Sequence, residues 1–116
     1  MAATFRVVRI EESPRWPSGD SRDIAMIRIR LTDLERRIGA SLLTGDEPGM
    51  GRWWAAGLEL VSGAPVEIIR YEGDPESQFV IRADANADGA RVREEAMAAL
   101  ALDRAALLWR PSDDAR

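Results

Sequence analysis

Three β-rich segments joined by two short turns constrain the fold of this chain more than any other feature. The segments cover residues 54–61, 66–72 and 79–83, and the turns between them read Ser-Gly-Ala-Pro and Gly-Asp-Pro-Glu-Ser. Neighbouring strands connected by turns this short pair antiparallel, because a parallel pair needs a crossover of roughly a dozen residues or more. The middle of the chain therefore predicts an antiparallel β-meander.

Further strands are indicated on both sides of this meander. Residues 4–12 are rich in β-branched side chains, and residues 23–31 alternate apolar side chains with arginine, as in a half-buried strand. Residues 107–110 predict a short last strand, whereas the glycine-rich segment 45–52 is interpreted as a loop. The polar face of the sheet is expected to carry Arg28, Arg30, Glu59, Glu67 and Arg82.

Two segments have the pattern of helices. Thr32 and Glu35 have the spacing of a capping box, and the apolar residues that follow repeat every four positions, which predicts a helix over 33–43. The segment 90–101 is rich in alanine and glutamate and predicts a second helix. The order of elements indicates an α+β fold, an antiparallel β-sheet with two α-helices packed on one face.

The length of 116 residues favours a single domain that spans 1–116, with residues 112–116 expected to form a frayed tail. No uncharged apolar run approaches the roughly 20 residues that a membrane span needs. The N-terminal residues lack the charged-then-apolar order of a signal peptide, and the chain has no cysteine. We therefore expect a cytoplasmic protein with no membrane partner.

The chain contains no cysteine, no histidine and no lysine, so all 16 basic residues are arginine. Thiolate nucleophiles, histidine-based triads, Schiff-base chemistry and most zinc sites are excluded by these absences. Carboxylates, hydroxyls, arginine and the single Tyr71 remain for chemistry, which leaves a small carboxylate enzyme as a minor alternative. The composition predicts a protein that is not an enzyme.

The formal net charge of −4 comes from the second part of the chain. Residues 1–50 carry eight arginines and eight acids, whereas residues 51–116 carry eight arginines and twelve acids. An acidic chain gains little of the counterion-release free energy that drives nucleic-acid binding. The charge therefore argues against a nucleic-acid partner and favours a basic protein partner, because opposite fields accelerate association.

One motif has a direct chemical interpretation. Asp84, Asn86, Asp88, Gly89 and Glu95 match the calcium-loop spacing D-x-[DN]-x-[DN]-G-x5-E, in which alternate side chains converge on one ion. The flanks differ from those of a calcium loop, because a strand and not a helix is predicted before it. The favoured interpretation is a polar strand-to-helix turn whose helix is capped by Asp88, with no cofactor, and a calcium site is the alternative.

Tryptophan and arginine are the residue types most enriched at binding hot spots, and here they occur together. Trp16, Trp53 and Trp109 each have an arginine as immediate neighbour. An alternative places Trp54 and Trp109 in the core, with Trp16 and Trp53 covering an edge of the sheet. Acidic residues of the meander are expected to steer a basic partner. The candidate partner-binding residues are Arg15, Trp16, Arg52, Trp53, Glu67, Glu72, Asp74 and Glu76.

The stretch from Gly57 to Glu67, the strand pair, the turn from Asp84 to Gly89, the alanine-rich helix and the closing Leu-Leu-Trp109 together resemble small immunity proteins of bacterial polymorphic and contact-dependent toxin systems. The resemblance covers roughly residues 53–110 and rests on pattern alone. It implies a cytoplasmic inhibitor that binds and neutralises one cognate toxin, and an acidic chain suits a basic nuclease toxin. The alternatives are a single-site calcium-binding domain and a homo-oligomer, such as a homodimer joined through an exposed edge strand.

Overall fold

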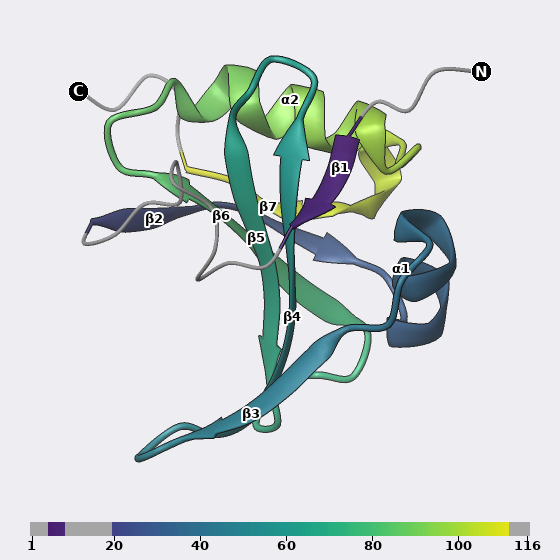
Figure 1. Cartoon of the computed structure of the whole chain (residues 1–116), viewed down its shortest axis with the longest axis vertical. Coiled ribbons are helices and arrows are strands. Elements are labelled where there is room, and N and C mark those ends of the chain that lie inside the picture. The colour runs from purple at the N-terminus through teal and green to yellow at the C-terminus, as the bar shows by residue number, and fades with distance from the viewer. Residues whose placement is uncertain (1–4, 9–19, 112–116) are drawn as a thin grey trace.

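The computed structural model describes residues 5–8 and 20–111, so Arg15, Trp16 and the expected tail at 112–116 lie outside the described residues. Along the chain, the elements are β1 (Phe5–Val8), β2 (Ser21–Arg28), α1 (Leu31–Ile38), β3 (Leu43–Glu47), β4 (Gly51–Leu60), β5 (Pro65–Tyr71), β6 (Gln78–Asp84), α2 (Gly89–Ala99), the 3-10 helix η2 (Arg104–Ala106) and β7 (Leu107–Trp109). The expected α+β class is confirmed (Figure 1).

The strands form one antiparallel sheet of seven strands in the order β1-β4-β5-β6-β2-β7, with β3 also paired to β4. The ten-residue strand β4 holds the sheet together, because it pairs with β5 along one edge and with two short strands along the other. Its first part, 51–55, pairs with β3, and its last part, 57–60, pairs with β1. The predicted meander is therefore β4, β5 and β6, as the short turns require.

The first helix is shorter than the pattern predicts. Gly39 adopts a left-handed conformation with φ of 72° and ends α1 after Ile38, because glycine tolerates this backbone without steric cost. The capping box is also wrong. The helix starts two residues earlier, with Arg30 as N-cap in place of Thr32, and the Glu35 carboxylate instead accepts a hydrogen bond of 2.8 Å from the Leu42 amide. Arg30 is thus placed at the start of the helix and not on the sheet.

The prediction of a loop over 45–52 is also wrong. Residues 43–47 form β3, whose pairing with β4 makes a hairpin that extends away from the helices (Figure 1). The Thr44 hydroxyl supports this pairing, since it donates a hydrogen bond of 2.8 Å to the Trp53 carbonyl. Residues 48–50 supply only the connection between the two strands.

Both helices contribute to a single apolar core on one face of the sheet. From α1 come Leu34 and Ile38, and from α2 come Val92 and Ala96. Alternate residues of the strands meet them, and α2 lies across β2, β4 and β6 (Figure 1). The strand residues of the core are Ile24, Ala25, Ile27, Ala56, Leu58, Leu60, Val66, Ile68, Phe79, Ile81 and Ala83.

The other face of the sheet carries charged side chains, as predicted for Glu59, Glu67 and Arg82. Arg6 of β1 pairs with Glu59 of β4 at 2.8 Å. Arg82 of β6 lies between two acids, at 3.1 Å from Asp23 of β2 and at 3.7 Å from Glu67 of β5. Cross-strand pairs of opposite charge support the sheet register on a face that the helices leave uncovered.

The tryptophans divide between the two surfaces of the sheet. Trp54 is half-buried and packs against the apolar core, as the core interpretation expects. Trp109 is 47% exposed, so its assignment to the core is wrong. It belongs to the three-residue edge strand β7, which gives a large side chain little cover. Within the described ranges, no helix has the length and apolar character needed to cross a membrane.

Candidate functional site

Two segments lie at the same end of the sheet, and we call them together the tip: residues 45–53 of the β3–β4 hairpin and residues 70–77, which are the last two residues of β5 and the connection that follows it. The pairing of β4 with β5 joins them, because Trp53 lies opposite Tyr71. Arg52 and Glu72 then exchange two hydrogen bonds. The Glu72 amide donates to the Arg52 carbonyl at 2.8 Å, and the Arg52 amide donates to Glu72 Oε1 at 3.0 Å.

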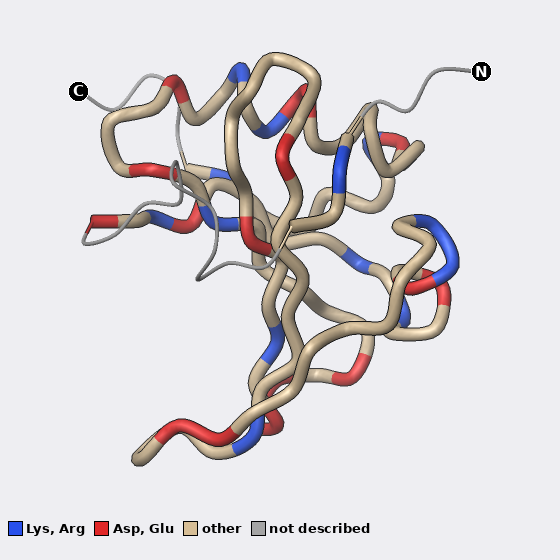
Figure 2. Tube along the Cα trace, in the orientation of Figure 1, with Lys and Arg blue, Asp and Glu red and all other residues tan. Residues whose placement is uncertain are grey.

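Most of the net charge of the protein is located at the tip. Five acids and two arginines lie there, which leaves three of the four excess negative charges of the chain at this end. Figure 2 shows acidic residues on both segments, at the end of the sheet away from α2. The acids are Asp46, Glu47, Glu72, Asp74 and Glu76, and the arginines are Arg52 and Arg70. All five acidic residues are exposed.

The connection after β5 is fixed by hydrogen bonds of its own. Asp74 Oδ2 accepts from the Tyr71 amide at 3.0 Å, which closes the turn. Arg70 donates to the carbonyls of Asp74 and Pro75, each at 3.1 Å, and its guanidinium lies 4.9 Å from the ring centre of Trp54. Arg70 is thus engaged with the turn and with an aromatic ring, and it supports the backbone of the connection that carries Glu72, Asp74 and Glu76.

A pocket opens on the helix-free face of the sheet beside the tip, and we call it the tip pocket. It is lined by Glu47, Trp53, Glu67, Ile69, Tyr71 and Arg82. Its volume of about 210 Å³ is below the roughly 300–1,000 Å³ of typical small-molecule sites. A cavity of this size is suited to a single side chain inserted by a partner.

The electrostatics of the tip pocket favour a cation. Glu67 is only 14% exposed, and the closest Arg82 nitrogen lies at 3.7 Å, beyond hydrogen-bond distance. Burial raises the pKa of Glu67, an effect that Arg82 opposes and that the negative charge of Glu47 reinforces. A cationic side chain that enters the pocket would pair with Glu67 and lie against aromatic walls.

Arg82 does not fill that role by itself, because it is shared among three neighbours. Its Nε donates to Asp23 Oδ1 at 3.1 Å, and its guanidinium lies 5.9 Å from the ring centre of Tyr71. Burial opposes the charge of Arg82, but hydrogen bonds with Tyr71 and Asp23 outweigh burial and raise its pKa. Arg82 therefore remains charged and forms one wall of the tip pocket.

The structure brings most of the predicted partner-binding residues together. Trp53 and Glu67 line the tip pocket, while Arg52, Glu72, Asp74 and Glu76 belong to the tip. Arg15 and Trp16 lie outside the described residues. Four further residues complete the pocket and were not among the candidate residues: Glu47, Ile69, Tyr71 and Arg82. Tyr71 had a signal in the sequence, because it follows Glu67 by four positions in one strand and so shares its face.

Three of the four predicted calcium ligands, Asp84, Asp88 and Glu95, accept hydrogen bonds within the protein through their carboxylates. Asp84 Oδ1 accepts from the Asn86 amide at 2.9 Å, and Asp88 accepts from the Arg91 amide at 3.3 Å. The Glu95 carboxylate accepts from the amide and hydroxyl of Ser62, at 3.0 Å and 2.6 Å.

The strand-to-helix turn with Asp88 as N-cap of α2 is confirmed. In the part of the chain that the structure describes, no three acidic side chains gather as a metal site would require. Calcium binding at this loop stays a prediction.

Comparison of the chain with protein-family models, curated proteins and solved structures finds no match. The function of the chain is therefore inferred from the chemistry of the surfaces described above.

Proposed function

We propose that this protein is a non-enzymatic binding module that recognises a basic protein partner through the tip and the tip pocket. More specifically, we propose that it is an immunity protein, which neutralises a cognate toxin by covering a basic surface of that toxin. The observation that carries the proposal is the location of the acidic tip next to an aromatic-walled pocket with a half-buried glutamate, at one end of the sheet.

The acidic tip and the tip pocket would act at different stages of binding. An exposed group of like charges accelerates the encounter with an oppositely charged protein, mainly through the association rate constant. The half-buried Glu67 carboxylate beside Trp53 and Tyr71 would instead hold an arginine or lysine of the partner after docking, and so would lower the dissociation rate. The fixed backbone of the connection after β5 reduces the entropy lost on binding.

A nuclease toxin is a suitable partner on chemical grounds. Its nucleic-acid-binding surface needs arginine and lysine to contact phosphates. An acidic protein of this size that binds such a surface would exclude the nucleic acid without performing any reaction of its own.

The proposal is tested with a charge-neutralised tip variant that carries Glu72→Gln, Asp74→Asn and Glu76→Gln. Each substitution keeps a side-chain oxygen, so that the hydrogen bonds accepted from Arg52 and Tyr71 are retained. The matched control removes three exposed acidic charges elsewhere, with Asp20→Asn, Asp88→Asn and Asp103→Asn, and asparagine is also a good N-cap at the last two positions.

Tagged wild-type protein is used to capture its partner from host cells, and the purified partner is then titrated with all three proteins by biolayer interferometry. We expect the tip variant to associate about tenfold more slowly at low salt, with a weaker salt dependence, and the control to behave as wild type. Trp53→Ala should instead accelerate dissociation. Equal kinetics for the tip variant and the control would contradict the role of the tip.

The inhibitory role is tested separately, by expressing the captured partner with and without this protein. We expect arrest of growth by the partner alone and rescue by wild-type protein, with weaker rescue by the tip variant. A partner that leaves growth unaffected in the absence of this protein would contradict the immunity role.

A further inference from the structure

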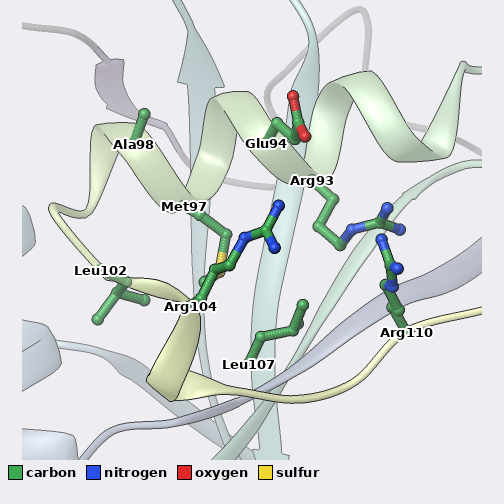
Figure 3. Close-up of a pocket in the computed structure, with 8 residues that line it drawn as sticks. All are labelled: Arg93, Glu94, Met97, Ala98, Leu102, Arg104, Leu107 and Arg110. Atoms are coloured by element: carbon green, nitrogen blue, oxygen red, sulfur yellow. The ribbon is translucent and has the colours of Figure 1, made fainter.

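A second pocket lies between α2 and the segment that leads through η2 into β7, and we call it the arginine pocket (Figure 3). It is lined by Arg93, Glu94, Met97, Ala98, Leu102, Arg104, Leu107 and Arg110, and its volume is about 470 Å³. It shares no residue with the tip pocket. We infer that the arginine pocket binds a small organic anion, in which a carboxylate or phosphate group is attached to an apolar body.

The charged side chains that line the arginine pocket are mostly positive. Three arginines and one glutamate line this pocket, in a protein whose net charge is −4. The guanidinium groups of Arg93 and Arg110 point toward each other, and that of Arg104 extends over Met97, whereas the Glu94 carboxylate points away from them (Figure 3). Guanidinium groups offer paired donors that match the oxygens of carboxylates and phosphates, so a lining with three of them suits an anionic group.

The position of Arg93 also favours an anion. It is 4% exposed, and it is the single buried polar or charged side chain among residues 5–8 and 20–111. Its Nη1 lies 3.4 Å from the carbonyl oxygen of Ile24, and its neighbour Val92 is part of the apolar core. A charge held in surroundings of low polarity interacts more strongly with an anion than the same charge in water. Arg93 therefore gives the pocket a fixed cationic wall.

Part of the lining of the arginine pocket is apolar. Met97, Leu102 and Leu107 are half-buried and pack against the core, so their exposed atoms form a firm apolar surface beside the guanidinium groups. The volume lies within the roughly 300–1,000 Å³ of typical small-molecule sites. An inorganic anion would leave this surface in contact with water, whereas an alkyl or aromatic body would cover it. The expected ligand is thus amphipathic.

The inference is tested by isothermal titration calorimetry of the full chain with sodium octanoate and with octyl phosphate. Octanol serves as the uncharged probe and inorganic phosphate as the probe without an apolar body. We expect saturable binding of at least one octyl anion at one site per chain. Binding should be at least about tenfold weaker for octanol and for phosphate alone, because each lacks one half of the interaction. The two octyl anions distinguish a carboxylate ligand from a phosphate ligand.

Arg104→Ala and Arg110→Ala are the test variants, since both side chains are exposed and neither belongs to the core. Arg91→Ala is the matched control, because Arg91 is an exposed arginine of α2 that does not line the pocket. We expect each test variant to weaken binding by about fivefold or more and the control to bind as wild type. Circular dichroism confirms that each variant is folded.

Two results would overturn the inference. One is the absence of saturable binding for both octyl anions. The other is binding that the double variant Arg104→Ala, Arg110→Ala retains at wild-type affinity. Both results are independent of the partner-binding proposal, because no residue of the arginine pocket belongs to the tip.

Discussion

Glu95 offers the sharpest test of how this structure is held together, because it links two distant parts of the chain. Its carboxylate accepts hydrogen bonds from the Ser62 amide at 3.0 Å and from the Ser62 hydroxyl at 2.6 Å, so that α2 is tied to the β4–β5 turn. The substitution Glu95→Ala removes both bonds. Hydrogen bonds to charged groups contribute about 1.5–3 kcal/mol each.

The expected loss is smaller than the sum of two such bonds, because Ser62 is exposed and Glu95 is half-buried. In the variant, water can accept part of the hydrogen bonding that the Glu95 carboxylate accepted from Ser62. We therefore expect Glu95→Ala to lower the free energy of unfolding by about 1.5 kcal/mol, which corresponds to a decrease in Tm of roughly 5 °C for a domain of this size. The free energy of unfolding of Glu95→Gln should lie between those of wild type and Glu95→Ala, since glutamine retains one oxygen acceptor.

Glu94→Ala is the matched control, because Glu94 is an exposed glutamate at the adjacent position of the same helix. Glu94→Ala removes the same charge and brings the same gain in helix propensity as Glu95→Ala. It should change the free energy of unfolding by no more than about 0.5 kcal/mol. Urea unfolding in EDTA, followed by circular dichroism, measures all variants. Equal stabilities for the Glu94 and Glu95 variants would refute the structural role of the carboxylate.

The same experiment repeated in millimolar calcium addresses the calcium alternative. If Glu95 supplies two oxygens to an ion, its substitution should act only when calcium is present, whereas the hydrogen bonds to Ser62 predict the full loss in EDTA. A rise in Tm with calcium that Asp84→Ala abolishes would establish the calcium site. An unchanged Tm would dismiss it.

Three further predictions concern stability, each for a different physical reason. Burial raises the pKa of Glu67, so the folded protein binds this proton more tightly than the unfolded chain, and the stability that Glu67 contributes should fall as pH rises from acidic to neutral; the difference in stability between wild type and Glu67→Gln should change accordingly in urea unfolding measured across that pH range, and parallel curves would contradict it. Gly51→Ala forces a side chain onto a backbone with φ of 85° and places its Cβ 2.1 Å from Glu72 Oε1, whereas Gly49→Ala at φ of 84° meets only open space. Leu58→Ala leaves a cavity at a fully buried position and should cost about 2–5 kcal/mol in urea unfolding; a smaller loss would place Leu58 outside the packed core.

The regular elements of this protein follow from local signals in its sequence. The short turns after β4 and β5 require antiparallel pairing, and the alternation in 23–31 predicts a half-buried strand, which the structure contains as β2. The turn at 84–89 also follows from its residues, because Asp88 is a strong N-cap and caps α2. In each case, neighbours in the sequence supply the interactions that stabilise the element.

Other features depend on contacts between residues that are distant in the sequence. Residues 43–47 have no strand pattern of their own, and they form β3 because β4 offers an unpaired edge beside them. Glu35 matches a capping box but serves Leu42 instead, once Gly39 ends the helix. Trp109 is apolar enough for a core yet lies on an edge strand.

Both candidate sites also depend on contacts between residues that are distant in the sequence. The tip pocket joins Glu47, Glu67 and Arg82 from three strands, and their meeting depends on the register of β3, β4, β5 and β6. The arginine pocket likewise forms because the segment after α2 turns back to pair with β2. The sequence by itself determined which segments pair locally and where the charge lies. Only tertiary packing decided which side chains meet, because strand register and burial are set by the free energy of the whole sheet and core.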